Sequence, residues 1–313
     1  MKRLIFFSVA IIAVLLLGIY LIIPGTVRQS VTVHPAAPET VVTRYLALKK
    51  GWAAWWPDGK GADPRDSSRF TYKGVRFSIV KNTYSAITII LSDGRTRIPS
   101  VITLVPGRNS GSEITWTFSY PAGDDPVSRL LGFRKSRKLA AVTEELLTRF
   151  RNFVEDEKEV YGVGIEYTKV RDSLVVVMRS MSDRYPTTLE VYEKVRKLQE
   201  FIGKNGISKD GYPMLNVSRT DDSRYRVMVA IPVRQRAKAP GNMEYSRLVL
   251  GNILTAEVRG GQASIDQALR QVRRFVEDRR HTSPAIPFQM MITDRLQEPD
   301  SSKWITRIYY PIL

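Results

Sequence analysis

Residues 165–170 read Ile-Glu-Tyr-Thr-Lys-Val, and residues 243–248 read Met-Glu-Tyr-Ser-Arg-Leu, 78 positions further along the chain. Three further matches follow in the same order, at offsets of 77, 74 and 79 residues: Val195-Arg196-Lys197 with Val272-Arg273-Arg274, Tyr212-Pro213-Met214 with Ile286-Pro287-Phe288, and 229–233 with 308–312. Ordered matches indicate one unit of about 75–80 residues present twice, too long and too few in number for a solenoid. We expect the copies to pack as a pseudo-symmetric pair with a ligand-binding cleft at their seam.

Each copy shows the pattern strand, strand, helix, strand, strand. The expected elements are 165–170, 173–181, 187–204, 213–219 and 225–233 in copy one (165–233), and 243–249, 252–258, 264–280, 287–293 and 304–312 in copy two (243–313). Ser264 is the expected N-cap of the second helix. Pro232 and Pro311 are expected to end the last strands, because proline donates no ladder hydrogen bond.

Over about 160–313 this pattern resembles the GyrI-like domain, which is also the effector-binding domain of multidrug-responsive transcription activators. The segments 255–261, 264–276 and 306–311 carry the resemblance. It implies a small molecule, often aromatic or cationic, in the groove between the copies. Where the family often has an acidic residue, four positions before the final proline, this chain has Arg307, which favours a carboxylate or phosphate. No DNA-binding pattern precedes the module, so we do not expect a transcription activator.

The N-terminal half predicts a strand at 30–34, a helix from about Pro35 to Pro57, a loop at 58–68, a set of strands and a long helix that ends near Glu157. The strands are expected at 70–72, 75–80, 85–91, 97–105 and 113–120. This is the layout of a curved antiparallel sheet wrapped around one helix. Over about 30–157 it resembles the START-like, polyketide-cyclase-like (SRPBCC) helix-grip family, through the helix after His34-Pro35 and the tryptophans at 55 and 56. The resemblance implies an apolar cavity that takes a hydrophobic molecule.

Residues 4–23 are apolar and carry no charge, and about 20 such residues cover a bilayer core as a helix. Lys2 and Arg3 precede the segment, which favours a cytoplasmic N-terminus and a bulk on the other side. We therefore expect a single-pass anchor in a bacterial inner membrane with the rest of the chain in the periplasm. A cleaved signal peptide is the alternative, although the run is longer than usual for one and lacks a small-x-small site.

The composition limits the function classes. The chain has 313 residues, a net charge of +17 that is spread along the sequence, and no cysteine. Disulfides, thiolate nucleophiles and Cys-ligated zinc are thereby excluded. The positive charge fits a basic solvated surface or attraction to anionic lipid, and no helix-turn-helix, zinc or RNP pattern points to nucleic acid. His34 and His281 lie far apart, so we expect no His-based triad, metal site or cofactor.

The candidate ligand-binding residues are Glu257, Trp304, Arg307, Tyr309 and Tyr310 in the duplicated part, and Trp55, Trp56 and Trp116 in the first domain. For each, core packing or solvent exposure is the structural alternative, because aromatic residues are most often core residues. The predicted function is a membrane-tethered sensor or carrier with two tandem ligand-binding domains and no catalysis. A hydrolase or cyclase that uses Glu257 with Tyr309, and a non-catalytic envelope scaffold, remain alternatives.

Overall fold

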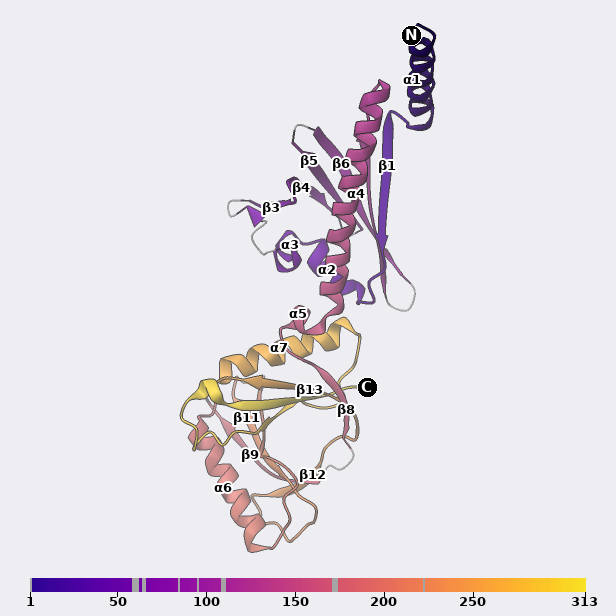
Figure 1. Ribbon diagram of the computed structural model, residues 1–313. Coiled ribbons are helices and arrows are strands. Elements are labelled where there is room, and N and C mark those ends of the chain that lie inside the picture. The colour runs from indigo at the N-terminus through magenta and orange to yellow at the C-terminus, as the bar shows by residue number, and fades with distance from the viewer. Residues whose placement is uncertain are drawn as a thin grey trace. The chain divides into compact units, whose positions relative to one another are not determined.

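The computed structural model describes residues 2–57, 62–63, 66–83, 85–94, 96–107, 111–170, 174–221 and 223–313, without the side chains of 2–5, 8–9, 49, 62–63 and 66–67. The chain separates into two compact units, Met1–Asp156 and Glu157–Leu313 (Figure 1). Both units combine an antiparallel sheet with helices, which confirms the expected α+β class. Within the described part of the chain, no helix has the length and apolarity needed to cross a membrane.

Unit 1 consists of an N-terminal helix, a seven-stranded antiparallel sheet and a long helix that packs on the sheet (Figure 1). Its helices are α1 (Lys2–Ile22), α2 (Glu39–Leu46), α3 (Lys49–Trp55) and α4 (Pro126–Glu155). Its strands are β1 (Thr26–Val33), β2 (Ala62–Asp63), β3 (Asp66–Tyr72), β4 (Val75–Asn82), β5 (Ala86–Asp93), β6 (Thr96–Pro106) and β7 (Ser112–Pro121), in the sheet order β1-β7-β6-β5-β4-β3-β2. Helix α4 buries Leu139, Val142, Leu146, Phe150 and Val154, the apolar stripe that helical periodicity predicts.

Two strands of unit 1, β1 and β3, begin four residues earlier than expected. β1 starts at Thr26 and not at Ser30, because β7 offers it partners from Thr26↔Pro121 to Val33↔Ile114. β3 starts at Asp66, inside the expected loop at 58–68, of which residues 58–61 and 64–65 lie outside the described residues. Pairing with the neighbouring strand decides where β1 and where β3 begins. The residues around each starting point do not reveal this pairing.

The single helix expected up to Pro57 is two helices, α2 and α3. The break falls at Leu48, whose extended backbone (φ −92°, ψ 123°) interrupts the helical path. The two helices approach closely at Gly51, where a Cβ would lie 2.6 Å from the Tyr45 Cα. This turn directs the side chains of Trp52, Trp55 and Trp56 into the interior of unit 1.

Unit 2 contains the two copies, and each has the order strand, strand, helix, strand, strand. After the short α5 (Glu157–Tyr161), copy one comprises β8 (Glu166–Val170), β9 (Leu174–Ser182), α6 (Thr188–Lys204), β10 (Met214–Arg219) and β11 (Tyr225–Pro232). Copy two comprises β12 (Glu244–Arg247), β13 (Gly251–Arg259), α7 (Gln262–Asp278), β14 (Phe288–Met291), the 3₁₀ turn η2 (Ser301–Lys303) and β15 (Ile305–Pro311). Ser173, the expected first residue of the second strand, lies outside the described residues.

The copies exchange their first strands. The eight-stranded antiparallel sheet has the order β12-β9-β11-β10-β14-β15-β13-β8. β8 of copy one therefore pairs with β13 of copy two, and β12 of copy two pairs with β9 of copy one. The copies also meet at the centre of the sheet, where Met214 of β10 lies opposite Met290 of β14.

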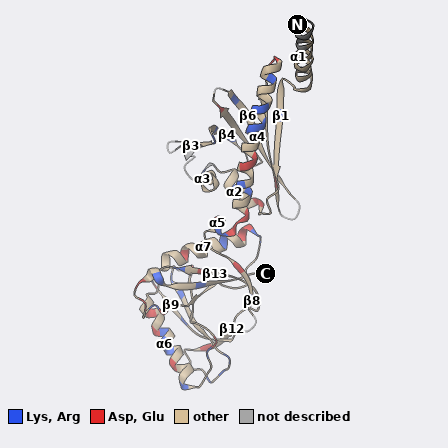
Figure 2. Ribbon diagram, viewed as in Figure 1, with Lys and Arg blue, Asp and Glu red and all other residues tan. Residues whose placement is uncertain are grey.

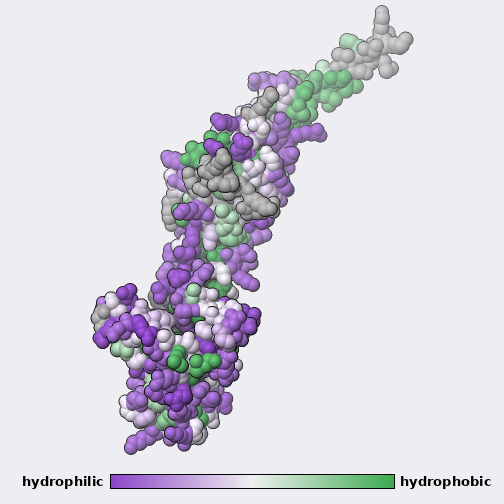
Figure 3. All heavy atoms as spheres, turned by 90° about the vertical axis from the view of Figure 1, so that its left-hand side faces the viewer, coloured by the Kyte–Doolittle hydropathy of each residue, from purple (hydrophilic) through white to green (hydrophobic). Residues whose placement is uncertain are grey.

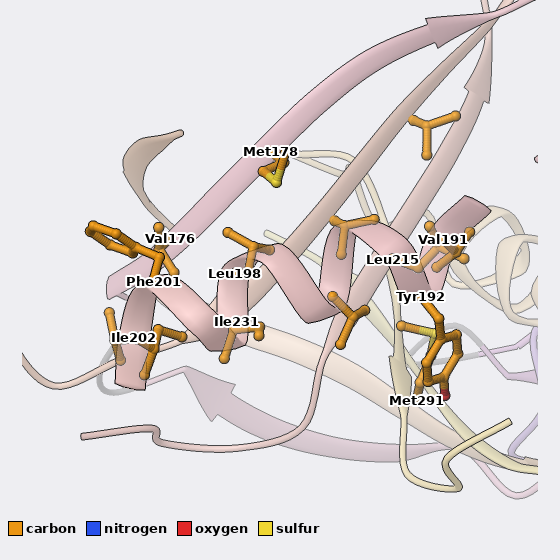
Figure 4. Close-up of a cluster of buried hydrophobic side chains, with 14 of the residues drawn as sticks. Val176, Met178, Val191, Tyr192, Leu198, Phe201, Ile202, Leu215, Ile231 and Met291 are labelled. Carbon is orange, nitrogen blue, oxygen red and sulfur yellow. The ribbon is translucent and has the colours of Figure 1, made fainter. Parts of the chain in front are cut away.

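Both helices pack on one face of this sheet and leave the other face open. Figure 4 shows α6 with Leu198, Phe201 and Ile202 directed at Val176 and Ile231 of the strands. Helix α6 has a capping box in which Thr187 and Glu190 bind each other's backbone N–H groups. Ser264 is not the N-cap of α7 as expected: the helix begins at Gln262, and its N-cap is Gly261, which offers no side-chain oxygen.

Candidate functional site

The open face of the unit 2 sheet contains a hollow at the junction of the two copies. It consists of two adjoining cavities of about 170 and 260 Å³ that share lining residues from both copies. The shared residues are Val170, Val175, Met214, Leu248, Ile253 and Phe288. An apolar cavity of about 150 Å³ is large enough for one benzene molecule, so the hollow has room for at least one aromatic ring.

The floor of the hollow comes from alternate residues of the central strands. Successive side chains of a strand point to opposite faces. Val176 and Leu215 therefore belong to the core under α6, while Val175, Val177, Met214 and Ala230 form a separate cluster on the open face. Met228, Phe288 and Met290 pack around that second cluster. Methionine adapts its shape to different neighbours, so this floor suits an irregular apolar ligand.

Cross-strand register places two rows of side chains across the open face. One row is Glu244, Val177, Ala230, Met214, Met290, Arg307 and Glu257. The pseudo-symmetric row has two segments. One is Glu166, Thr255, Tyr309 and Phe288 on the copy-two side, and the other is Asn216, Met228 and Arg179 on the copy-one side. The middle of each row is largely apolar, and the charges stand at the ends.

Two ion pairs neutralise most of these end charges. Arg307 donates to Glu257 Oε2 at 2.8 Å, directly across the β13–β15 ladder, and Arg179 forms an ion pair with Glu244. The hydrogen bond to Glu257 raises the pKa of Arg307. Arg307 therefore already has a carboxylate partner, and its expected preference for an anionic ligand stays a prediction.

The side-chain oxygen of Asn216 is buried beside the hollow without a hydrogen-bond partner among the described residues. Asn216 donates through Nδ2 to the carbonyl oxygen of Pro287 at 2.7 Å, which fixes the orientation of its amide. Its Oδ1 atom is buried and accepts no hydrogen bond from the described residues. A buried acceptor of this kind normally has a partner, so a ligand hydroxyl or N–H group is a suitable one.

The predicted residues of the duplicated part separate in the structure. Tyr309 lines the hollow, and its ring stacks on Phe288 with centroids 5.0 Å apart. Tyr310 faces the opposite side and is buried. Trp304 donates to the carbonyl oxygen of Glu298, and its ring lies 4.9 Å from the guanidinium of Arg295. Neither Tyr310 nor Trp304 is among the described residues that line the hollow.

Trp304 belongs to a polar cluster on the helix side of the sheet. Arg295 is buried there, donates to Thr306 Oγ1 at 3.0 Å, and has its pKa lowered by that burial. Burial likewise raises the pKa of Tyr185 to about 12. The cation–π contact with the guanidinium of Arg295 therefore explains the position of the Trp304 ring within the fold.

Glu257 is poorly placed to act as a general acid or base. Its side chain is 55% exposed and accepts the hydrogen bond of Arg307. A general acid or base has to lie within hydrogen-bond reach of a substrate proton, and the Glu257 carboxylate is instead held by Arg307 at the edge of the open face. The position of Glu257 thus gives no support to the alternative of a Glu257–Tyr309 catalytic pair, which stays untested. The expected absence of catalysis stays a prediction.

The tryptophans predicted as ligand-binding residues of the first domain are core residues of unit 1. Trp55 and Trp56 are 2% exposed, and Trp116 is fully buried. Their indole N–H groups donate to the carbonyl oxygens of Tyr45 and Thr71 and to Ser100 Oγ. The rings contact Phe70, Phe77 and Phe150, which is the core packing named as the structural alternative. A role in ligand binding stays a prediction.

Sequence reasoning missed the methionines and Asn216 of the hollow. A signal was present in β9, where residues 174–178 read Leu-Val-Val-Val-Met without alternation. A continuous apolar run is typical of a strand that is covered on both faces. Helix α6 covers one face of this strand, so the run indicates an apolar site on the other.

Comparisons with known proteins give similarity to solved structures over about half of the chain. The C-terminal domain of EcmrR is 16% identical, with a TM-score of 0.42 over 48% of this chain and 98% of that one. SAV2435 bound to tetraphenylphosphonium is 13% identical, with a TM-score of 0.33 over 48% and 94%. A hydrolase from Listeria innocua is 11% identical, with a TM-score of 0.36 over 48% and 91%. No family model and no curated protein matches the sequence.

Proposed function

We propose that this chain is a membrane-tethered sensor or carrier that binds an uncharged, mainly apolar small molecule in the hollow of unit 2. The observation that carries the proposal is the apolar floor of Met214, Met228, Met290 and Phe288 at the junction of the copies. The pairs Arg307–Glu257 and Arg179–Glu244 stand at the ends of the open-face rows, and none of these four residues is among the described residues that line the hollow. Asn216 Oδ1 adds one acceptor for a ligand hydroxyl or N–H group.

The proposal includes the finer family and membrane assignments. Unit 2 is a GyrI-like domain, and unit 1 is a START-like helix-grip domain whose interior its own tryptophans occupy. Helix α1 is the anchor in a bacterial inner membrane, with the N-terminus in the cytoplasm and the bulk of the chain in the periplasm. The charge-free run at 4–23 and the exposed side chains of Phe6, Leu21 and Ile22 support this role. No nucleic acid or cofactor is part of the proposal.

Ligand binding is tested on the full chain in lipid nanodiscs. Native mass spectrometry is expected to show a co-purified apolar mass that leaves when the protein unfolds. The uncharged fluorescent probe N-phenyl-1-naphthylamine should bind above the level of empty nanodiscs. Met228→Trp fills the hollow and should abolish both signals, because its indole occupies the floor.

The matched control is Leu189→Trp on α6, where the native side chain is 71% exposed. This variant should keep the bound mass and the probe signal, and circular dichroism should show that both variants are folded. A wild-type chain without bound mass or probe binding would contradict the proposal and favour an envelope scaffold. Equal binding by Met228→Trp and the wild type would place the ligand elsewhere.

A further inference from the structure

The first turns of α4 expose apolar side chains on the side that faces away from the sheet. Val127 is 58% exposed, Leu130 38% and Leu131 53%. The opposite side of the helix presses against backbone at Gly132, where a Cβ would lie 2.4 Å from the Ala122 Cα. Helical spacing places the three exposed residues together on one face, which is unusual for a face in contact with water.

This apolar face lies beside the end of α1. Arg129 donates to the carbonyl oxygens of Tyr20 and Ile23, the latter at 3.1 Å, and its guanidinium lies 3.7 Å from the centre of the Tyr20 ring. These contacts satisfy carbonyl groups that a helix C-terminus leaves without partners. Figure 1 shows the first turns of α4 alongside the last turns of α1. The apolar surface of α1, drawn green in Figure 3, includes Leu21 and Ile22 at 74% and 80% exposure.

The next turns of α4 are cationic. Between Pro126 and Thr143 the chain has five lysines or arginines and no acidic residue. Arg129 is engaged with α1, and the other four are exposed: Arg134, Lys135, Arg137 and Lys138. Figure 2 shows these cations in blue along the first half of α4. Asp124 and Asp125 stand at the tip of the helix, where Asp125 is the N-cap and accepts from the backbone N–H of Ser128.

We propose that the segment from Val127 to Lys138 of α4 forms a lipid-binding surface at the bilayer interface. Val127, Leu130 and Leu131 contact the boundary between acyl chains and headgroups, and the four exposed cations bind anionic headgroup phosphates. An apolar face followed by lysine and arginine is the pattern of interfacial helices. The inference rests on the proposed role of α1 as an anchor, because Arg129 holds the two helix ends together. It assigns unit 1 a second membrane contact that fixes its orientation on the bilayer.

The test uses the absence of cysteine, which makes every introduced thiol unique. The variants Leu131→Cys, Leu21→Cys and Val80→Cys are labelled with an environment-sensitive fluorophore in the full chain. They are reconstituted in nanodiscs of phosphatidylcholine with phosphatidylglycerol, with and without bromine on the acyl chains. Val80 is the control, since it is 57% exposed on β4, which stands four positions from β1 in the sheet order, while α4 packs on β1 and β7.

Bromine is expected to quench the probes at positions 21 and 131 and to leave the probe at position 80 unchanged. Quenching at 21 without quenching at 131 would overturn the α4 surface and leave the anchor intact. An absence of quenching at both positions would overturn the anchor and, with it, this inference. Circular dichroism of each labelled protein checks that it is folded.

A second arm tests the headgroup charge. Arg134→Glu combined with Lys138→Glu should lower the quenching at position 131 in nanodiscs with phosphatidylglycerol and leave it unchanged in pure phosphatidylcholine. Since Arg129 is retained, the α1 contact remains, and quenching at position 21 should not change. An equal response in both lipid compositions would overturn the assignment of the cations to anionic headgroups.

Discussion

At the residue scale, charged residues at the ends of the open-face rows in unit 2 are paired with one another. Arg307 and Glu257 lie 50 residues apart in sequence and face each other across two strands. Their side chains are 42% and 55% exposed, so the pair contributes little to stability. Its larger effect is to neutralise one end of the apolar floor.

We predict that Glu257→Gln makes the site more favourable to anions. The substitution leaves Arg307 without its carboxylate, and one half-exposed charge contributes about 1 kcal/mol, or about fivefold in affinity. Fluorescence competition should show that a carboxylated analogue of the naphthylamine probe gains about fivefold relative to the uncharged probe. Arg307→Met, which removes the cation, should show no such gain. A Glu257→Gln protein with unchanged preference would mean that the ligand binds away from this pair.

At the scale of the element, the two copies use different N-termini for equivalent helices. α6 has the Thr187–Glu190 capping box, whereas α7 follows Gly260 and Gly261. Gly260 has a φ of +127°, and a Cβ there would lie 2.5 Å from Ser264 Oγ. Only glycine adopts this conformation without strain. The turn into α7 therefore depends on backbone geometry, and the turn into α6 depends on side-chain hydrogen bonds.

We predict opposite effects for two glycine substitutions in unit 2. Gly260→Ala should destabilise the unit by about 1–3 kcal/mol through backbone strain. Gly203→Ala, near the end of α6 with no neighbouring atom within 4 Å, should stabilise it by about 0.5–1 kcal/mol. Urea unfolding monitored by hydrogen exchange of unit 2 peptides measures both effects. A neutral Gly260→Ala would show that the turn into α7 does not require a positive φ.

At the scale of the molecule, each copy completes the sheet of the other. β8 extends the half built by copy two, and β12 extends the half built by copy one. Neither copy therefore has its full set of strand partners alone. The hollow has lining residues from both copies, so it forms only when they are assembled.

We predict that cutting the chain between the copies leaves unit 2 assembled. A protease site inserted between Gly241 and Asn242, both exposed, separates the copies covalently. The two pieces should co-elute in size-exclusion chromatography because three strand pairings join them, and they should separate in denaturant. The uncut protein gives the reference elution. Separation of the pieces under native conditions would contradict the strand exchange.

Local periodicity in the sequence determined the elements and the repeat. The stripe Leu139–Val154 predicted the buried face of α4, and the ordered matches from 165 to 312 predicted two similar halves. Such patterns depend on residues a few positions apart, which a single sequence contains. The tertiary structure decided the exchange of β8 and β12, the break at Leu48, the burial of Trp116 and the pairing of Arg307 with Glu257. Each of these depends on partners distant in sequence or on close backbone approach, so local propensity carries no information about it.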